Sequence, residues 1–393
     1  MFSDLLIEKG ETMFSDGIGR RNFLKRLSSA AIGALAARFL GASPSSAKTE
    51  NAVNLEYHTL GKTGLKVTCV GMGVMNCSDS AVVLRAFDLG INFFDTAPSY
   101  MRGRNEEMVG KAFKGRREKV YIQTKVELGD EKRMQASVEM SLRRLQTDYF
   151  DILLWHGLNS AEQVSDGKLS AFMERMKKEG KARFTGFSAH SRMAPLLREA
   201  AKGSGHDVAL VSYNFTHSKD LKEAVAMAAK SGIGIVAMKT QAGGYKREKM
   251  GKLSPHQAAL KYVLRDPNVT LAVPGVTTIE QMEECAAVMG ATLSQRDLHE
   301  LRQYQAFLQG RICTMCGACT GVCPYGVGYD QALRAVMYQD AYEDRGLAEE
   351  ALAKGFALQD LNRCARCESC SATCKRGVNI QAQVRAAQQI LNG

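Results

Sequence analysis

Residues 313–324 read CTMCGACTGVCP, and residues 364–375 read CARCESCSATCK. Both stretches have the spacing C-x2-C-x2-C-x3-C, and together they hold eight of the eleven cysteines in the chain. This spacing is typical of ferredoxin-type [4Fe–4S] ligation, in which three close thiolates bind one cluster and the fourth binds its neighbour. The sequence therefore predicts a domain built around two [4Fe–4S] clusters.

Each cluster is expected to bind three cysteines of one run and the last cysteine of the other run. Zinc sites prefer cysteine pairs with a longer gap, and disulfide frameworks are typical of small secreted domains, so both alternatives are disfavoured. The other cysteines, Cys69, Cys77 and Cys285, are expected to be small buried side chains. One cluster would be bound by Cys313, Cys316, Cys319 and Cys374, and the other by Cys364, Cys367, Cys370 and Cys323.

The segment between the two runs is predicted to be helical. Tyr329–Ala353 is rich in Ala, Leu and Glu and contains no proline. Residues 310–393 are therefore expected to form a small α-helical ferredoxin-type domain. Arg366, Lys375 and Arg376 lie close to the second run. Their positive charge would stabilise the reduced state of the cluster, which is the more negatively charged one, or would bind an acidic redox partner protein. A solvated basic surface is an equal alternative.

Residues 1–50 resemble an export signal followed by a linker. Arg20 and Arg21 open the stretch RRNFLK, an apolar stretch covers Leu27–Ala37, and small residues follow over Ser43–Ala47. This layout is typical of the twin-arginine route. We expect recognition by the twin-arginine translocase, which carries folded proteins, and a periplasmic location. A basic amphipathic helix that stays on a cytoplasmic protein is the alternative.

The chain carries a formal net charge of +11 at pH 7. Residues 1–47 hold six Lys or Arg and four Asp or Glu, so +9 remains without them. Neither a basic low-complexity tract nor a nucleic-acid motif accompanies this charge, so no nucleic-acid partner is predicted. No segment is long and apolar enough to cross a membrane, so no transmembrane segment is predicted either.

Residues 51–309 have the length and the alternating pattern of one (β/α)8 barrel. No GxGxxG follows the first strand, which disfavours a dinucleotide-binding Rossmann fold. Helices are expected over Met134–Gln146 and over Gln295–Leu308, and the second of these would lead into the cysteine-rich domain. The predicted strands are Thr68–Val74, Asn92–Asp95, Val120–Lys125, Phe150–Trp155, Ala182–Ser188, Val208–Tyr213, Ile233–Lys239 and Val269–Val273.

Polar or charged residues follow nearly every predicted strand, at the end where barrel enzymes place their chemistry. A buried Asp95 or Lys125 would need a partner, and each could serve the other. From the second strand to the eighth, the strand ends carry Asp95, Lys125, His156, Ser188, Asn214, Lys239 and Gly275.

Five segments at these strand ends resemble segments of the aldo-keto reductases. The resemblance covers about residues 55–290. The whole chain is similar to the subgroup that joins this barrel to a C-terminal ferredoxin-type domain behind a twin-arginine signal. The segments are FFDTAPSY (Phe93–Tyr100), IQTKV (Ile122–Val126), DILLWHG (Asp151–Gly157), FTGFSAH (Phe184–His190) and VPGVTTIEQMEE (Val273–Glu284).

The resemblance implies a catalytic tetrad of Tyr100, Asp95, Lys125 and His156. Tyr100 would protonate a carbonyl oxygen of a small-molecule carbonyl or alcohol substrate. Lys125 would lower the pKa of Tyr100, Asp95 would hold Lys125, and His156 would orient the carbonyl. Taken singly, Asp95 also fits a strand-end turn and His156 a satisfied core histidine.

The cofactor side departs from the family pattern. Ser188 and Glu284 match expected cofactor contacts. Gly275 and Gln281 stand where a Lys and an Arg would hold a 2′-phosphate, so the sequence does not favour NADP over NAD. Lys239 could meet a pyrophosphate or an anionic substrate. Ala189, Leu210 and Met238 replace the remaining family contacts to the nicotinamide.

The number of electrons that each group transfers leaves the choice of cofactors open. NAD(P)(H) gives a hydride, two electrons together, whereas a [4Fe–4S] cluster takes one, and a flavin is the usual converter. Three functions therefore compete. The first is an iron–sulfur oxidoreductase with Tyr100 as its acid and the clusters as an electron relay. The second is an electron-transfer or binding protein whose barrel has lost nicotinamide binding. The third is an ordinary reductase whose clusters only stabilise the structure of the C-terminus.

The loops that would shape the substrate pocket are short. This favours either an open site or one capped by the ferredoxin-type domain, because the helix Gln295–Leu308 leads directly into Cys313. Capping requires that domain to sit at the C-terminal ends of the barrel strands.

Overall fold

The computed structural model describes residues 53–242, 254–316, 319–355 and 361–392. The export signal predicted over residues 1–50 lies outside these ranges. The barrel and the cysteine-rich domain belong to one compact unit, Ala52–Gly393.

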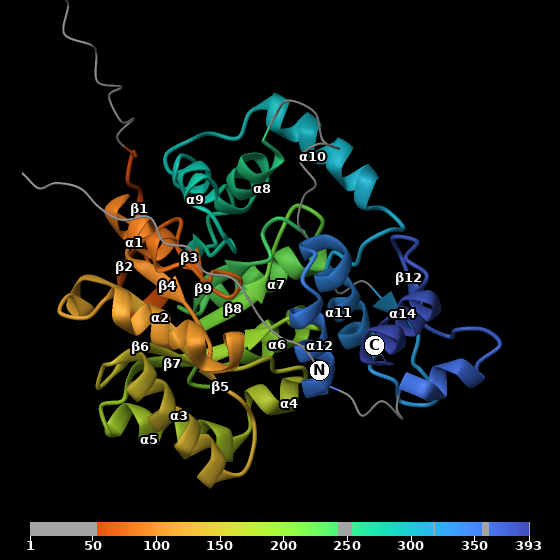
Figure 1. The fold of residues 1–393 in the computed structure, drawn as a ribbon, viewed down its shortest axis with the longest axis horizontal. Helices are drawn as coiled ribbons and strands as arrows, with labels where there is room; N and C mark the ends of the chain where they lie inside the picture. The colour runs from red at the N-terminus through yellow and green to blue at the C-terminus, as the bar shows by residue number, and fades with distance from the viewer. Residues whose placement is uncertain (1–52, 243–253, 317–318, 356–360, 393) are drawn as a thin grey trace, which may run out of the picture. The chain divides into compact units, whose positions relative to one another are not determined.

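Eight parallel strands form the barrel, in chain order around a single sheet (Figure 1). Parallel bridges between Val70 and Ala272 and between Gly73 and Gly275 join the first strand to the last. The predicted (β/α)8 barrel is therefore confirmed. Its strands are β3 (Met72–Gly73), β4 (Phe93–Asp95), β5 (Tyr121–Val126), β6 (Phe150–Trp155), β7 (Ala182–Ala189), β8 (Val208–Ser212), β9 (Gly234–Met238) and β10 (Leu271–Ala272).

Helices follow each barrel strand, and most begin at a capping side chain. Asp130 accepts a hydrogen bond from the N–H of Arg133, and Ser254 precedes Pro255 at a helix start, so the sequence itself marks where each helix begins. The helices are α1 (Ser80–Asp88), α2 (Arg104–Ala112), α3 (Glu131–Leu145), α4 (Ala161–Val164), α5 (Gly167–Lys178), α6 (Met193–Ala200), α7 (Lys219–Lys230), α8 (Pro255–Leu264) and α9 (Ile279–Ala286).

The start of the barrel differs from the prediction. Thr68 ends β2 (Lys66–Thr68), which pairs antiparallel with β1 (Tyr57–Thr59). The predicted strand Thr68–Val74 is therefore divided: Thr68 belongs to the hairpin, whereas Val70 bridges Ala272 and Met72–Gly73 form the barrel strand β3. The chain turns between the two pieces because the Thr68 hydroxyl donates to the carbonyl oxygen of Val70 at 2.8 Å.

Two apolar layers stabilise the barrel. The outer layer lies between strands and helices. The inner layer fills the barrel and includes Leu60 and Leu65 from the β1–β2 hairpin, which pack with Phe93, Ile152 and Leu210. Burial of these side chains is the main favourable term in folding. The filled interior leaves the strand ends as the place for chemistry.

Four further α-helices lie in the described residues after the barrel. α10 (Gln295–Leu308) has the predicted bounds and leads to the cysteine-rich domain, which contains α11 (Tyr329–Tyr342), α12 (Arg345–Gly355) and α14 (Ile380–Asn392). The predicted helix over Tyr329–Ala353 is broken at Glu343, whose φ of 55° is left-handed. Two short strands, β11 (Cys319–Thr320) and β12 (Thr373–Cys374), pair antiparallel.

The cysteine-rich domain is attached to the end of β8. Nε2 of His217 donates to the carbonyl oxygen of Met315 at 3.1 Å, and Nδ2 of Asn214 donates to that of Thr314 at 3.4 Å. Arg376 also donates to the Thr216 carbonyl oxygen. The domain therefore sits at the C-terminal ends of the strands, as capping requires.

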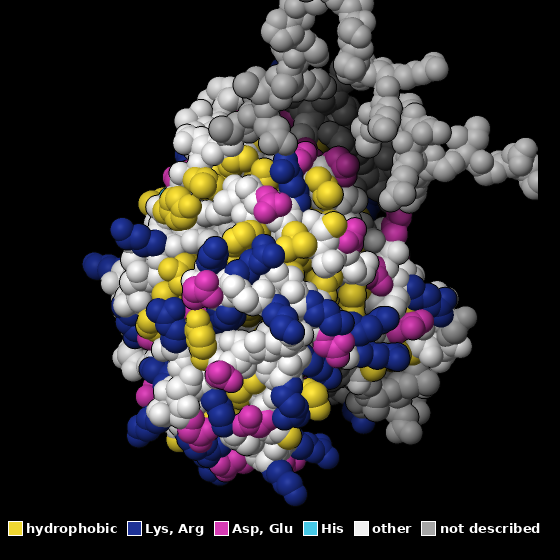
Figure 2. Space-filling model, turned by 60° about the vertical axis from the view of Figure 1, so that its left-hand side comes forward, with side chains coloured by type: hydrophobic (Ala, Val, Ile, Leu, Met, Phe, Trp, Pro, Cys, Tyr) yellow, Lys and Arg dark blue, Asp and Glu magenta, His cyan; other side chains and the backbone are white. Residues whose placement is uncertain are grey.

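In the part of the chain that the structure describes, no helix is long and apolar enough to cross a membrane. Figure 2 shows one face of the molecule, where Lys and Arg side chains are interspersed with Asp and Glu. The positive charge on this face is spread out and does not form a single basic stripe.

Candidate functional site

Tyr100 lies just beyond the end of β4 and begins a short 3-10 turn, Tyr100–Gly103. The next two residues, Met101 and Arg102, have left-handed φ values of 49° and 57°. Such φ values are uncommon for residues other than glycine and cluster at functional sites. They turn the chain sharply after the tyrosine and lead into α2.

Asp95 and Lys125 form a buried ion pair at the ends of β4 and β5. Nζ of Lys125 donates to Oδ1 of Asp95 at 2.8 Å and to the Thr96 carbonyl oxygen at 2.7 Å. Nε2 of Gln123 donates to the same Asp95 oxygen at 2.7 Å. The mutual partners predicted for Asp95 and Lys125 are therefore present.

Two histidine rings complete this end of the barrel. The His156 ring lies 6.2 Å from the Tyr100 ring, edge to face, and its Nδ1 is 3.7 Å from Oε1 of Glu127. The ring of His190 lies 6.4 Å from that of His156. His190 directly follows Ser188 and Ala189, but no sequence pattern assigns it to the site.

Burial and neighbouring charges act on the pKa of Tyr100. Burial raises the pKa of Tyr100 well above its ordinary value of 10, and the negative charge of Asp95 adds to the rise. Burial also lowers the pKa of Lys125, against the opposing effect of Asp95. The expected lowering of the Tyr100 pKa by Lys125 stays a prediction, since burial and the charge of Asp95 are the main influences on this pKa and both raise it.

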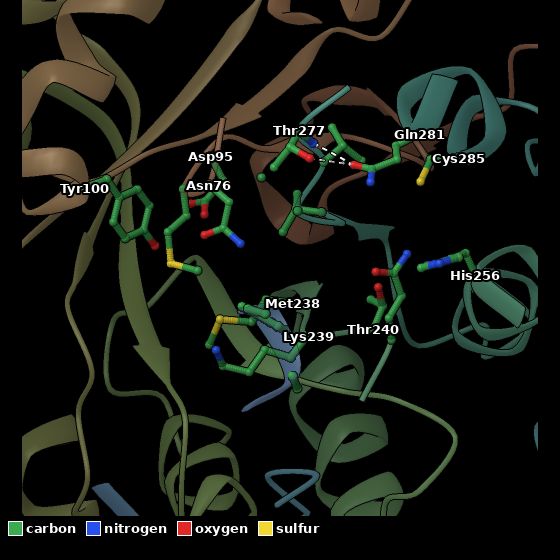
Figure 3. Close-up of a pocket in the computed structure, with 18 of the residues that line it drawn as sticks. Asn76, Asp95, Tyr100, Met238, Lys239, Thr240, His256, Thr277, Gln281 and Cys285 are labelled. Carbon is green, nitrogen blue, oxygen red and sulfur yellow. Dashed lines mark hydrogen bonds between the residues drawn. The ribbon is translucent and has the colours of Figure 1, made fainter. Parts of the chain in front are cut away.

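A cavity of about 1150 Å³, counted to its open mouth, runs from Tyr100 and Asp95 to α9. Figure 3 shows Tyr100, Asp95 and Asn76 at one end and His256 and Cys285 at the other. The cavity is elongated and polar at both ends. That shape suits a ligand with two separated polar groups.

Four of the five predicted cofactor residues line this cavity: Lys239, Gly275, Gln281 and Glu284. Gln281 is tied to Thr277, whose N–H and hydroxyl donate to it at 2.8 and 3.1 Å.

Ser188 is absent from the lining. It joins β6 to β7 by accepting from the N–H of Gly157 at 2.9 Å and donating to the Trp155 carbonyl oxygen at 3.2 Å. Cys285 lines the cavity, and Cys69, Cys77 and Cys285 are all buried as predicted.

A second cavity lies on the other side of Tyr100. It is bounded by Arg102 and Arg104 of the barrel and by Asp344 and Glu350 of the cysteine-rich domain. Because Tyr100 lines both cavities, its hydroxyl can be approached from two directions.

Helix α11 contributes side chains to the barrel mouth. Nζ of Lys239 donates to the Tyr338 hydroxyl at 2.8 Å and lies 4.6 Å from the centre of that ring. Ala341 and Tyr342 line the first cavity. Burial raises the pKa of Tyr338, but Lys239 and Arg334 outweigh it and hold the pKa below its ordinary value. Sequence reasoning missed Arg334, Tyr338 and Tyr342, because a helical pattern does not reveal which face meets another domain.

The last cysteine of each run is among the charged neighbours of the first cysteine of the other run. Burial raises the pKa of Cys313 to about 12, and the neighbours whose charges add to the rise are Cys319, Cys316 and Cys374. Burial also raises the pKa of Cys364, with Cys370, Cys367 and Cys323 as its neighbours. Among the described residues, no three His, Cys, Asp or Glu side chains are close enough to hold a single metal ion. A cubane cluster binds each cysteine at a separate iron, so wider spacing fits it.

Close contact between the two cysteine runs depends on Gly321. Its φ is +86°, and a Cβ there would lie 2.1 Å from the carbonyl oxygen of Ser371. Without a side chain at this position, Cys319 of β11 can stand directly opposite Cys374 of β12. This places the last cysteine of the second run beside the third of the first.

Two family profiles match the chain. The Aldo/keto reductase family matches residues 73–253 and 247–306, and the 4Fe-4S dicluster domain matches residues 295–379. Among curated proteins, L-galactose dehydrogenase from Arabidopsis thaliana is 28% identical over 304 residues, which cover 65% of this chain and 95% of the relative.

Solved structures match the same portion. The holo form of aldo-keto reductase AKR11C1 from Bacillus halodurans is 25% identical, with a TM-score of 0.54, and the match covers 63% of this chain and 96% of that one. An aldo-keto reductase from Klebsiella pneumoniae in complex with NADPH is 25% identical with a TM-score of 0.54, and the match covers 64% and 95% of the two chains.

Proposed function

Since the chain belongs to the aldo/keto reductase family and ends in a 4Fe-4S dicluster domain, we propose that this oxidoreductase interconverts a small carbonyl compound and its alcohol at Tyr100. We further propose that two [4Fe–4S] clusters relay electrons between this site and a redox partner protein. Reduction of the carbonyl would consume two electrons and two protons.

One observation carries this proposal: the first cysteine run is anchored beside the reactive strand ends. Thr314 and Met315, which directly follow Cys313, accept hydrogen bonds from Asn214 and His217 after β8. A negative charge on Cys313 also acts on Lys239, raising its pKa against the larger lowering by burial. A cluster held by this run would therefore lie close to the cavity that contains Tyr100.

The barrel residues supply proton transfer and orientation. Tyr100 keeps its proton because its pKa is raised, so its hydroxyl can donate to a carbonyl oxygen and give up the proton as the alcohol forms. Lys125, held by Asp95, would stabilise the phenolate that remains. His156, whose ring faces Tyr100, would donate a second hydrogen bond to the same oxygen.

The cysteine sets would hold the clusters in the crossed grouping. Cys313, Cys316, Cys319 and Cys374 would bind the cluster nearer the barrel, and Cys364, Cys367, Cys370 and Cys323 the other. When bound, such clusters supply one-electron transfer. Joining their single electrons to a two-electron hydride donor would need a converter such as a flavin.

The first cavity would hold NAD(P)(H) or another elongated cofactor. Gly275 leaves open space, since nothing lies within 4 Å of where its Cβ would be, and Gln281 and Glu284 line the same cavity. Such a dinucleotide would supply a hydride. A flavin in this cavity would join hydride and single-electron chemistry.

A single-turnover experiment tests the catalytic proposal. The cluster-loaded protein is reduced with dithionite, freed of excess reductant and mixed with a carbonyl compound while cluster absorbance is followed. Reoxidation should be about 100-fold slower or more in Tyr100→Phe. Tyr57→Phe, half exposed on the β1–β2 hairpin, should match the unchanged protein. Equal rates in Tyr100→Phe would remove Tyr100 from the role.

A second candidate function is electron transfer or binding by a barrel that does not use a nicotinamide. The occupation of Lys239 by Tyr338 favours it, because a residue expected to meet the cofactor already has a partner. Anaerobic titration with NADH and then NADPH distinguishes the two. Bleaching of the cluster absorbance by NADH or NADPH would mean that electrons pass from a nicotinamide site to the clusters. Bleaching by dithionite alone would favour this second function.

We also propose export through the twin-arginine translocase to the periplasm, on the strength of Arg20 and Arg21. Replacing both with lysine should retain the protein in the cytoplasm. Equal periplasmic amounts before and after the replacement would contradict this route.

A further inference from the structure

Helix α11 presents one face to the barrel mouth. Tyr338 on this face accepts from Lys239. Tyr342, one turn later, lies beside it with the two rings tilted and their centres 5.4 Å apart, and it lines the first cavity. Residues four apart share a helix face. Arg334, one turn before Tyr338, therefore also faces the barrel.

The charge of Arg334 reaches the reactive groups. After burial, the largest influence on the pKa of His190 is the positive charge of Arg334, which adds to the lowering. The same charge acts on Tyr100 and on Lys239. These groups lie on different strand ends, and the guanidinium is within electrostatic range of all three.

Most charged groups at this place have a neighbour of opposite charge or a hydrogen-bond partner among the described residues. Lys125 pairs with Asp95 at 2.8 Å. Lys239 donates to the hydroxyl of Tyr338, and the negative charge of Cys313 also acts on it. Arg334 is the exception: its buried Nε has no hydrogen-bond partner, and no carboxylate lies within ion-pair distance among the described residues. A bound carboxylate would give this guanidinium a partner.

We propose that the substrate carries a carboxylate next to its reactive carbonyl, and that Arg334 and Lys239 bind this carboxylate while the carbonyl points to Tyr100. The inference rests on the proposed function and specifies its substrate class. A guanidinium binds a carboxylate through two parallel hydrogen bonds. Burying two like charges without an anion is costly, so a bound monoanion stabilises the site.

In this arrangement the iron–sulfur domain is part of the substrate site. Arg334 comes from α11, whereas Tyr100 and Lys239 come from the barrel. The domain that carries electrons would thus also select the molecule that receives them.

A matched pair of probes tests the inference. Phenylglyoxylate and its methyl ester share the ketone and the ring and differ in the charge of the carboxyl group. Binding of each to the cluster-loaded full chain is measured by anaerobic calorimetry, without turnover. The acid should bind at least about tenfold more tightly than the ester, and Arg334→Gln should abolish the difference.

Two further variants sharpen the result. Arg334→Lys keeps the charge but loses the two-pronged geometry, so it should retain part of the preference. Arg302→Gln changes an exposed arginine on α10 and should behave like the unchanged protein. Equal binding of acid and ester, preference surviving in Arg334→Gln, or tighter binding of inorganic phosphate than of the acid would each overturn the inference.

The binding measurement is independent of the proposed reaction. If the acid binds through Arg334 but does not reoxidise the reduced clusters, the carboxylate site stands and the proposed redox function fails. If the ester is reduced through Tyr100 as well as the acid, the function stands and the carboxylate site fails.

Discussion

Nζ of Lys239, at the end of β9, donates a 2.8 Å hydrogen bond to the hydroxyl of Tyr338, which lies 99 residues later on α11. Tyr338 is buried and Lys239 is partly buried beside the first cavity. The bond joins the barrel to the iron–sulfur domain at the place where the family's chemistry is expected.

Loss of this bond should weaken the attachment of the domain. Tyr338→Phe leaves a partly buried ammonium without its acceptor, which costs about 1–3 kcal/mol. Urea unfolding followed by cluster absorbance measures the change. Tyr342→Phe is the control: its hydroxyl makes no hydrogen bond in the described residues, and its cost should stay below about 0.5 kcal/mol. Adding Lys239→Met to Tyr338→Phe should recover part of the loss. Strict additivity would show that the pair is not coupled.

The raised pKa of Tyr100 predicts that the rate of carbonyl reduction stays constant as the pH rises above neutral. Tyr100 should remain protonated through pH 10, its ordinary pKa, so the rate of carbonyl reduction should not decline between neutral pH and that value. Stability follows the same sign. The folded state holds this proton more tightly than the unfolded chain, so the contribution is fully present below pH 10 and is lost as pH rises through the higher folded pKa. A decline in rate below pH 9 that disappears in Tyr100→Phe with an external acid would contradict the assignment.

Gly321 should control cluster loading. Gly321→Ala introduces a Cβ 2.1 Å from the Ser371 carbonyl oxygen at a φ of +86°, and the backbone strain alone costs about 1–3 kcal/mol. The cysteine runs would then separate, and iron and labile sulfide per chain should fall. Gly326→Ala is the matched control, because its φ is also positive at +69° but nothing lies within 4 Å. Equal iron in the two variants would show that the close approach is dispensable.

Asp151 should matter for stability and not for chemistry. It is buried at the start of β6, where its carboxylate accepts from Arg117 and from Arg183 at 2.7 Å each. Asp151→Asn weakens two charge-assisted hydrogen bonds, to the mostly buried Arg117 and to the half-exposed Arg183, and should destabilise the barrel by about 1–3 kcal/mol. Thermal unfolding measures this, with exposed Asp148→Asn as the control. Turnover per folded molecule should be unchanged, and a specific loss of turnover would assign Asp151 a role at the site.

Much of the fold could be predicted because its signals are local. The buried strands read as continuous apolar runs, and β6 (Phe150–Trp155) and α10 (Gln295–Leu308) have the predicted bounds. The first strand failed because Thr68 and Met72 belong to one apolar run, TCVGMGV, which the chain divides between a hairpin and the barrel. Only the tertiary hydrogen bonds reveal that division.

The site was predictable where one strand end meets the next. Asp95 and Lys125 could be paired because adjacent parallel strands bring their ends together. Arg334 and Tyr338 could not, since their position depends on how α11 meets the barrel. The raised pKa of Tyr100 could not be predicted for the same reason. It results from burial, which depends on how the whole molecule is assembled and is not encoded by any single segment.

The carbonyls of Thr314 and Met315 are held by Asn214 and His217 from the barrel. The loop that carries Cys313 is thus fastened to the barrel, and α11 follows from the same domain. If the proposed clusters hold this loop in its place, a copy that lacks them would also lose the side chains that α11 brings to the barrel mouth. The proposed activity of the barrel would then depend on insertion of the clusters.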